Sequence, residues 1–465
     1  LDRESRRRNQ SLASMATSET AQSTASKKVD ASEYDLTQKI SPFLDAHLVF
    51  PLLDFLEENT SYEAGSVQRA RLDLLAPTNM VDYAIEIRSA LGDANAALVE
   101  GAPSVEAMEA RRDAVFEAME ALEAKVQRVA EVLEDAEAVE QMKRDGTYTA
   151  ADLEAKHGIG PANWADYFEF AKFLYECGDY EGARDMLDHY LALCFPAGKK
   201  LDASGFRALW GKFGSEVLLK NWEGALHDLG RLRAAIDDFG APPLEQLQQR
   251  SWLLHWSLFV FFNHAKGHDG IIDLFLNEKY LQAIQTNCPW LLRYLTTAVI
   301  INKRRRSTLK DLVRVITMEH DLKADPVTQF LECLYVKFDF EGAQRTLAEC
   351  DKALRSDYFL CNCADAFMED ARLFVFETYC RIHTKIDIGM LSDKLVMERE
   401  KAERWVVDLI RGALLDAKID SQDSCVVMGT DTTSVYSQVI DKTRDLSNRS
   451  AALLSALETK ICEAN

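Results

Sequence analysis

A short motif occurs three times in the chain and constrains its fold more than any other feature of the sequence. Each copy reads Asp or Asn, an aromatic residue, Glu, Gly and Ala, with a Leu four residues after the Ala. The copies are Asp179-Tyr180-Glu181-Gly182-Ala183 with Leu187, Asn221-Trp222-Glu223-Gly224-Ala225 with Leu229, and Asp339-Phe340-Glu341-Gly342-Ala343 with Leu347. The first two copies start 42 residues apart, which suits one two-helix repeat, and the longer interval before the third leaves room for degenerate repeats.

Each position of the motif has a physical role at a turn between two helices. The Asp or Asn can cap the second helix by accepting a backbone N–H, and the Glu in the first turn faces the positive end of the helix dipole. We expect the Gly and Ala to let the two helices approach closely, and the aromatic and Leu side chains to close the core of the pair. The motif therefore predicts helical hairpins stacked into an α-solenoid.

The N-terminal part of the chain divides into a polar tail and a helical region. Residues 1–31 contain almost no large apolar side chain, so we expect a disordered tail. Apolar residues then recur at helical spacing, which predicts a helical-repeat domain over 32–365, with its second helix beginning at Pro51. Within this domain, a seam of apolar residues predicts one long amphipathic helix over 104–145, packed on its own domain or on another chain. This stretch carries 12 acidic and 6 basic residues.

The pattern changes after about residue 366. Helical spacing continues to Ile382, short apolar residues lead into two further helices, and two short strands follow over 415–420 and 425–428. This order predicts a winged helix over 366–432, and a last helix is expected within 433–465. The residues expected to form the core and docking face of the winged helix are Leu391, Leu395, Trp405, Leu409, Ile419, Val426 and Val427. The predicted fold class is mostly α: a solenoid of helical hairpins, a winged-helix module and a C-terminal helix.

Length and charge limit the class of protein. The 465 residues are 47% hydrophobic and 28% charged, which is typical of a folded chain with two or three structural units. Lys and Arg total 54 against 75 Asp and Glu, so the formal net charge is −21. Such a surface repels phosphate and argues against a general nucleic-acid coat protein.

One basic island interrupts this acidic background. It consists of Lys303, Arg304, Arg305 and Arg306, and with Arg293, Lys310 and Arg314 it gives residues 293–314 a net charge of +6. The island could contact RNA phosphate, an acidic partner or an import receptor, or it could be a solvated face. The predicted winged helix is different, because residues 371–430 hold 9 basic and 10 acidic residues. That balance favours protein binding over the reading of DNA.

The sequence contains no convincing catalytic or cofactor signature. It lacks a phosphate loop, a His-Glu-x-x-His motif, a nucleophile elbow and a calcium loop. Cys361, Cys363, Cys380 and His383 could be drawn as a zinc site, but their spacing favours ordinary packing. His255 lies in a segment that is apolar on nearly every face, so we expect a hydrogen-bonded core histidine. We therefore predict a protein that is not an enzyme and has no metal site and no cofactor.

The sequence also bears on location. The longest uncharged stretch, Ser251–Ala265, has 15 residues and contains polar side chains, so it is too short and too polar to span a bilayer. No secretory signal pattern is found, so we expect a cytoplasmic protein without membrane contact, and a nuclear pool is compatible with this.

A solenoid followed by a winged helix resembles the PCI domain, which occurs in scaffold subunits of the proteasome lid, the signalosome and the third eukaryotic translation initiation factor. Several blocks of sequence are similar to the family of E subunits of that factor. They include Tyr34-Asp35-Leu36-Thr37, His47-Leu48-Val49-Phe50-Pro51-Leu52-Leu53, Leu209-Trp210-Gly211-Lys212 and Leu415-Asp416-Ala417-Lys418-Ile419-Asp420. The resemblance extends from about Tyr34 to the C-terminal helix.

This resemblance implies a non-catalytic scaffold subunit that assembles with other PCI subunits through its PCI module and C-terminal helix. It further implies binding to the small ribosomal subunit, support of mRNA recruitment to that subunit, and contact with the cap-complex scaffold protein. RNA contact would then fall on the basic island. Two alternatives stay open: a PCI scaffold subunit of the proteasome lid or signalosome, and a winged-helix nucleic-acid binder.

Overall fold

A computed structural model describes most of the chain as two compact units, Leu1–Ala371 and Arg372–Asn465. The described residues are 34–58, 62, 64–94, 104–133, 136–145, 148–196, 200–265, 267–302, 308–318, 325–383, 385–387, 389, 404, 407, 417–420, 425–428 and 435–464. The predicted tail over residues 1–31 lies outside them.

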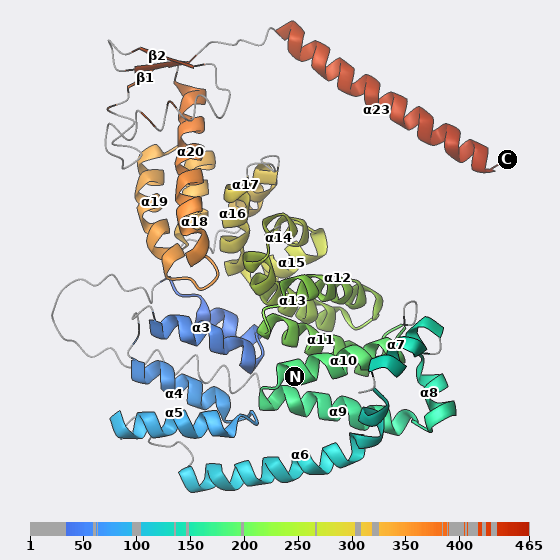
Figure 1. Ribbon diagram of the computed structural model, residues 1–465. Helices are drawn as coiled ribbons and strands as arrows, with labels where there is room; N and C mark the ends of the chain where they lie inside the picture. Colours follow the sequence, from blue (N-terminus) through green and yellow to red (C-terminus); the bar gives the residue numbers. More distant parts are fainter. Residues whose placement is uncertain are drawn as a thin grey trace. The chain divides into compact units, whose positions relative to one another are not determined.

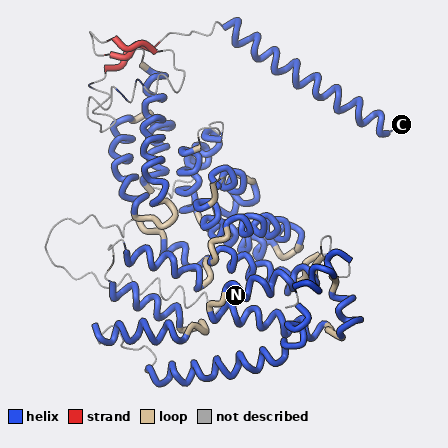
Figure 2. The backbone as a smooth tube through the Cα atoms, in the orientation of Figure 1, coloured by secondary structure: helices blue, strands red, loops and turns tan. Residues whose placement is uncertain are grey.

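The first unit is built from helices (Figures 1 and 2). Its N-terminal part contains α2 (Thr37–Ile40), the 3-10 helix η2 (Ser41–Phe43), α3 (Ala46–Glu58), α4 (Ala64–Leu75), α5 (Val81–Ala94), α6 (Val105–Leu133), α7 (Ala136–Asp145) and α8 (Ala150–His157). The middle part contains α9 (Pro161–Cys177), α10 (Tyr180–Cys194), α11 (Ala203–Leu218), α12 (Trp222–Asp238), α13 (Pro243–Asn263), α14 (Gly267–Phe275) and α15 (Glu278–Asn287). The last part contains η4 (Pro289–Leu291), α16 (Leu292–Ile301), α17 (Leu309–Met318), α18 (Pro326–Glu332), the π-helix η7 (Cys333–Lys337), α19 (Phe340–Arg355), η8 (Cys361–Cys363) and the start of α20 (Ala364–Ile382).

Successive helices of this unit pack on one another, which gives the predicted α-solenoid. Neighbours from α9 to α14 are in contact in sequence order, and the series continues through α16, α18 and α19. Large side chains such as Phe213, Phe259 and Phe330 are almost fully buried between the helices. Burial of each such side chain stabilises the folded state by about 1.5–3 kcal/mol.

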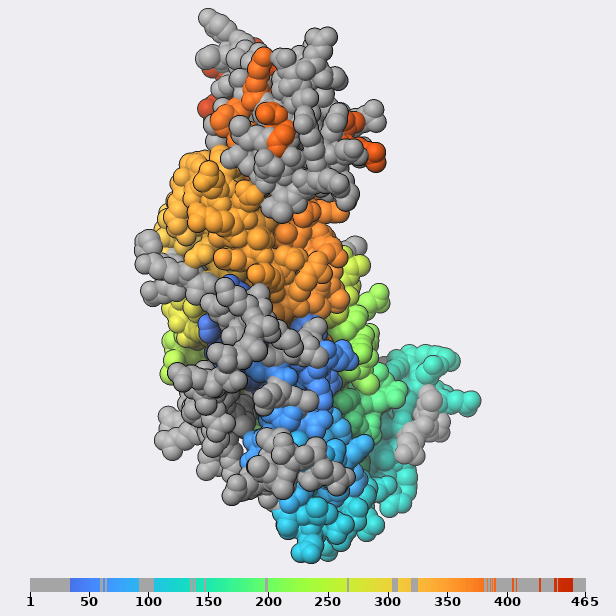
Figure 3. Space-filling model, turned by 90° about the vertical axis from the view of Figure 1, so that its left-hand side faces the viewer, coloured from blue at the N-terminus to red at the C-terminus, as the bar shows by residue number. Residues whose placement is uncertain are grey.

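The N-terminal segment, residues 34–58, is not an outer repeat, because it packs against three separate parts of the solenoid. The backbone oxygen of Phe43 accepts a hydrogen bond from Trp256 Nε1 at 3.1 Å. Tyr175 donates its hydroxyl to the carboxylate of Asp45 at 3.1 Å. Blue N-terminal residues therefore lie beside helices far along the sequence, as Figure 3 shows for the orange part of the first unit. The backbone oxygen of Tyr34 accepts from Arg293 at 2.8 Å, so the segment lies against α9, α13 and α16, which are far apart in the sequence.

The prediction that a helix begins at Pro51 is wrong. Helix α3 starts at Ala46 and continues through Pro51 to Glu58. A proline inside a helix removes one backbone hydrogen bond and costs about 3 kcal/mol. Apolar side chains on both sides of it, Leu48 before and Leu52 and Leu56 after, are buried in the same core. Their burial outweighs the cost of the proline.

The predicted single helix over 104–145 is two helices, α6 and α7. Met108 packs in a cluster with α4 and α5, and Val126, Val129 and Leu133 are buried at the other end of α6, which contacts α9. The helix thus packs on its own domain. A straight continuation past Leu133 would place Glu137 and Glu140 on the buried stripe and turn Val139 away from it. The structure instead buries Val139, at 4% exposure, in the separate helix α7.

The second unit contains the remainder of α20, a three-stranded antiparallel sheet and a long C-terminal helix, α23 (Val435–Ala464). The strands are β1 (Lys385–Asp387), β2 (Ala417–Asp420) and β3 (Cys425–Met428), in the order β1-β3-β2. Strands β2 and β3 match the two predicted strands, whereas at β1 the sequence indicates only apolar residues leading into a helix. Opposite Val426 lie Ile386 of β1 and Ile419 of β2.

In the part of the chain that the structure describes, no helix combines the length and apolar composition needed to cross a membrane.

Candidate functional site

The three repeat turns share one capping geometry. Oδ1 of the Asp or Asn accepts a hydrogen bond from the glycine N–H three residues later, at 3.0 Å for Asp179, 3.4 Å for Asn221 and 2.9 Å for Asp339. Each cap thereby satisfies an N–H that the first turn of a helix leaves without a partner. The motif residues begin α10, α12 and α19.

The residue before each cap has a left-handed backbone, with φ of 93° at Gly178, 59° at Lys220 and 52° at Phe338. At the first turn, Gly178 N and Asp179 N donate to the oxygens of Tyr175 and Leu174. At the second turn, Lys220 N and Asn221 N donate in the same way to the oxygens of Val217 and Glu216. This arrangement ends one helix and starts the next on adjacent residues. Only Gly178 carries a sequence signal for it, because Lys and Phe rarely adopt this conformation.

The third turn differs from the other two. Helix α18 passes into the π-helix η7 before the turn, and Asp339 N donates to the oxygen of Cys333, six residues back. The extra residue is absorbed in the π-helix. A π-turn leaves no distinctive pattern in the sequence, so sequence reasoning has no signal for it.

The glycines and alanines of the motif have separate tasks. A Cβ on Gly182 would lie 2.5 Å from Asp179 Oδ2, and a Cβ on Gly342 would lie 2.4 Å from Asp339 Oδ2. A Cβ on Gly224 would lie 2.7 Å from Nδ2 of the cap Asn221, and also 3.0 Å from Glu216 of the preceding helix α11. All three glycines therefore make room for the capping side chain, and of the three Gly224 also serves the close helix approach expected from the sequence. The main helix contact falls on the alanines, because Ala183, Ala225 and Ala343 are completely buried.

The aromatic positions of the motif, Tyr180, Trp222 and Phe340, are only half buried. Tyr180 has a particular neighbour, because its hydroxyl lies 2.9 Å from Nδ1 of His47 in the N-terminal segment. The following leucines, Leu187, Leu229 and Leu347, fill the core instead. The twelve motif residues are spread over three hairpins and do not converge on one site.

Most of the predicted docking residues of the winged helix lie outside the described residues: Leu391, Leu395, Trp405 and Leu409. Val426 is completely buried, Val427 is half buried, and Ile419 pairs with Val426 across the sheet. The structure therefore assigns Val426 to the interior of the second unit.

The basic residues Lys303, Arg304, Arg305 and Arg306 also lie outside the described residues. Arg293 is close to these residues in the sequence, but it is not on the surface of the protein. It is 3% exposed, and its guanidinium lies 2.6 Å from Asp325 and 3.3 Å from Asp357. Burial alone would lower the pKa of Arg293, but the two carboxylates more than offset this and raise it. Lys310 and Arg314 are exposed on α17.

The arginine is the centre of a buried polar cluster. Nη1 of Arg293 donates to the backbone oxygen of Tyr34 at 2.8 Å, and the Tyr294 hydroxyl donates to Asp357 at 2.8 Å. Asp325 also caps α18 by accepting from Thr328 N. The charges of Arg293, Asp325 and Asp357 are thus paired and hydrogen-bonded. Through Arg293 of α16, this cluster links the N-terminal segment to Asp325 at the start of α18.

Two of the three cysteines considered for zinc have ordinary surroundings, and the side chain of the third, Cys380, lies outside the described part of the chain. Cys361 and Cys363 lie in η8, and burial raises the pKa of both thiols. His383 packs against the ring of Tyr379, with centroids 4.2 Å apart. Over the described ranges, no three His, Cys, Asp or Glu side chains gather in a way that could hold a metal ion.

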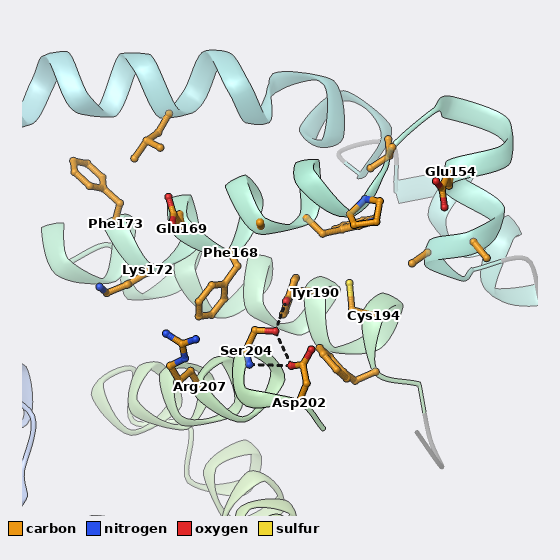
Figure 4. Close-up of a pocket in the computed structure, with 18 of the residues that line it drawn as sticks. Glu154, Phe168, Glu169, Lys172, Phe173, Tyr190, Cys194, Asp202, Ser204 and Arg207 are labelled. Carbon is orange, nitrogen blue, oxygen red and sulfur yellow. Dashed lines mark hydrogen bonds between the residues drawn. The ribbon is translucent and has the colours of Figure 1, made fainter. Parts of the chain in front are cut away.

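A groove of about 1020 Å³ opens between α6, α8, α9, α10 and α11 (Figure 4). Phe168 and Phe173 lie along it, with Lys172 and Arg207 at one end and Glu154 at the other. The hydroxyls of Tyr190 and Ser204 are joined by a hydrogen bond of 3.2 Å, and Ser204 in turn bonds the capping residue Asp202. Because five helices contribute to the groove, no local pattern in the sequence predicts it.

Two family models match the chain. The first, described as eIF3 subunit 6 N terminal domain, matches residues 35–174, and the second, described as PCI domain, matches residues 347–430. A curated relative, the E subunit of eukaryotic translation initiation factor 3 of Arabidopsis thaliana, is 43% identical over 436 residues, which is 91% of this chain and 96% of the relative. Proteins with the same description from Culex quinquefasciatus and Aedes aegypti are 46% and 45% identical, each over 92% of this chain and 96% of the relative.

The chain belongs to the family of E subunits of eukaryotic translation initiation factor 3. The PCI match of this initiation-factor chain begins inside α19 and ends after β3. It thus includes the second half of α19 and the whole of α20 as well as the sheet. Helix α20 is continuous through the boundary of the two units, so the repeat domain and the PCI module share a helix.

Proposed function

We propose that this chain acts as a non-catalytic scaffold subunit of the third eukaryotic translation initiation factor. It would assemble with other PCI subunits and support mRNA recruitment to the small ribosomal subunit in the cytoplasm. The observation that carries this proposal is similarity to E subunits of that factor over nearly the whole of both chains.

Helix α23 supports an assembly role. Five of its large apolar side chains, Val439, Ile440, Leu446, Leu453 and Leu454, are between 56% and 65% exposed. Val439, Leu446 and Leu453 recur every seven residues, the spacing of a helix that packs along another helix. Exposed apolar stripes of this kind are buried when a partner binds. The partner would be a helix of a neighbouring subunit.

Surroundings of the titratable groups favour a role without catalysis. Burial raises the pKa of the Cys177 thiol to about 11 and that of Cys288 to about 12. A thiol with a raised pKa is a poor nucleophile at neutral pH. His47 and His189 have pKa values lowered chiefly by burial, and each contacts a tyrosine hydroxyl.

Assembly is tested by expressing the tagged full chain in cells and following its sedimentation. Substitution of Leu446→Asp together with Leu453→Asp should remove most of the chain from fractions containing other PCI subunits, because charges would interrupt the stripe. Asn448→Asp with Ala452→Asp adds the same charge on the opposite side of α23 and should leave sedimentation unchanged. The assembly role of α23 is refuted if both pairs behave alike.

Contact with RNA is a separate proposal, supported by the four consecutive basic residues Lys303, Arg304, Arg305 and Arg306, with Lys310 and Arg314 exposed shortly after them in the sequence. Replacing Lys303, Arg304, Arg305 and Arg306 by Glu should weaken cross-linking of the assembled complex to RNA while assembly itself is preserved. Equal cross-linking would assign the island to a protein partner or to a solvated face. Contact with the cap-complex scaffold protein stays a prediction without assigned residues.

A further inference from the structure

Helix α6 has a strongly segregated surface. At 3.6 residues per turn, its seven acidic residues fall within an arc of about 120° around the helix axis. They are Glu106, Glu109, Asp113, Glu117, Glu120, Glu123 and Glu131, and all of them are exposed. We call this arc the acidic face of α6.

A large apolar side chain lies within the acidic face. Phe116 is 49% exposed, although the buried stripe of the same helix offers sites for apolar residues. Its neighbours three, four and seven residues away include Asp113, Glu120, Glu109 and Glu123. Val105, 37% exposed, lies at the start of the same arc. An exposed phenyl ring among carboxylates has the layout of an interface anchor with a polar rim.

The arginines of α6 are used for internal contacts. Arg111 donates to the backbone oxygen of Thr78 at 2.7 Å, Arg112 lies 3.7 Å from Asp82, and Arg128 donates to the oxygen of His157 at 2.9 Å. These contacts fix α6 to its neighbours. Apart from a 3.8 Å contact between Arg112 and Asp113, no ion pair to the acidic face is found among the described residues.

Like charges on the acidic face lie close together. Five pairs are three or four residues apart, in an unbroken series from Glu106 to Glu123, and such pairs destabilise a helix. Helices α5 and α9 contact α6 on one side, and Figure 1 shows no other described helix of the first unit on the opposite side. The repulsion is therefore not relieved within the described part of this unit.

We propose that the acidic face of α6 binds a lysine- and arginine-rich amphipathic helix of a partner protein, with Phe116 inserted into the partner's apolar stripe. Charge complementarity identifies the occupant. RNA carries the wrong charge for seven carboxylates, and a second copy of a chain with net charge −21 would be repelled. Helix α6 belongs to the first unit and α23 to the second, so binding at the acidic face is tested independently of the proposed assembly role.

The test uses the full chain and a fluorescent amphipathic peptide of alternating leucine and lysine pairs as the probe. A peptide with glutamate in place of lysine is the matched probe of opposite charge. Binding is measured by fluorescence anisotropy at physiological ionic strength. We expect the basic probe to bind and the acidic probe not to bind.

Two sets of variants separate the acidic face from general charge attraction. The first triple variant changes three residues of the acidic face, Glu117→Gln, Glu120→Gln and Glu123→Gln, and should raise the Kd for the basic probe about tenfold. The control removes the same charge from exposed positions on other helices, Glu223→Gln, Glu349→Gln and Glu369→Gln. It should change the Kd less than about twofold. Phe116→Ala should raise the Kd about fivefold. Neutralising the face should not lower the melting temperature, because it relieves like-charge pairs.

Three results would overturn the proposal. Equal weakening by both triple variants would mean diffuse attraction to an acidic protein, unchanged binding by Phe116→Ala would remove the anchor, and binding of the acidic probe would exclude charge recognition. The melting temperature of each full-length variant is the control for folding. If it does not fall, a change in Kd reflects the binding surface and not unfolding.

Discussion

The imidazole ring of His255 lies flat against the phenyl ring of Phe43, with centroids 4.3 Å apart and planes at 4°. Trp290 Nε1 lies 3.2 Å from Nε2 of His255, and Nδ1 of His255 lies 2.7 Å from the oxygen of Ser251. An indole N–H only donates, so Nε2 accepts and Nδ1 carries the proton. The histidine of α13 is thus held neutral between Phe43 of the N-terminal segment and Trp290 of η4, as expected for a core histidine.

His255 predicts a pH dependence of stability. Burial lowers its pKa to about 4, whereas an unfolded histidine has a pKa of about 6.5. The unfolded state therefore binds the proton first, and the contribution of His255, complete above pH 6.5, is lost as the pH falls from about 6.5 to about 4. The loss reaches about 3 kcal/mol at the lower end.

Denaturant unfolding at pH 7 and pH 5 measures this effect. The change in free energy of unfolding between the two pH values should be smaller in His255→Gln than in the natural sequence, since glutamine does not titrate. Parallel changes in both proteins would contradict a neutral buried His255.

The buried arginine gives a second prediction. Arg293→Met leaves Asp325 and Asp357 without their shared cation, and breaking such a buried pair costs about 3–5 kcal/mol. We expect a large drop in melting temperature by calorimetry. Arg355, which pairs with Asp351 and Asp365 at the surface, is the matched control, and Arg355→Met should leave the melting temperature nearly unchanged. Similar effects of the two changes would argue against the buried cluster.

The first repeat turn gives a third prediction, about coupling. Gly→Ala in a helix normally stabilises by about 1 kcal/mol, but a methyl group on Gly182 would displace the capping carboxylate of Asp179. Gly182→Ala alone should therefore be neutral or destabilising. In the background of Asp179→Ala, which itself costs about 1 kcal/mol, the same change should become stabilising. A double-mutant cycle with no coupling energy would show that the glycine has another task.

Lys220 gives a fourth prediction. Its left-handed backbone, with φ of 59°, strains any residue with a Cβ by roughly 1–2 kcal/mol. Lys220→Gly should remove this strain and raise the free energy of unfolding by about 0.5–1 kcal/mol, since glycine loses more backbone entropy on folding. Thermal unfolding measures the change, and a lower melting temperature would mean that the lysine side chain contributes contacts that outweigh the strain.

Local features of the fold follow from sequence, and features set by tertiary packing do not. The caps at Asp179, Asn221 and Asp339 depend on residues only three positions apart, so the motif predicts the hairpins directly. The expected helix start at Pro51 fails because the burial of Leu48 and Leu52 overrides the local preference of proline. Strand β1 has three residues and is defined by pairing with β3, which its own sequence cannot indicate.

The acidic face of α6 and the basic island also differ in how far the sequence predicts them. The acidic composition around α6 is plain from sequence, but the exposure of Phe116 depends on which side of α6 meets α5 and α9. Proximity in sequence groups Arg293 with the basic island, whereas its real neighbours are Asp325, Asp357 and Tyr34. Side chains of buried clusters come from distant segments, so linear spacing misassigns them.

The N-terminal segment has a consequence for how the chain is made. Tyr34 and Arg293, joined by a hydrogen bond, are 259 residues apart. At about 5–20 residues per second, Tyr34 is synthesised roughly 13–50 s before its partner exists. Helix α3 can pack on α4 as soon as α4 is made, since these two helices are in contact, but the contact of Tyr34 with α16 cannot yet form. The start of the N-terminal segment therefore reaches its final position on a nascent chain only after translation has passed α16.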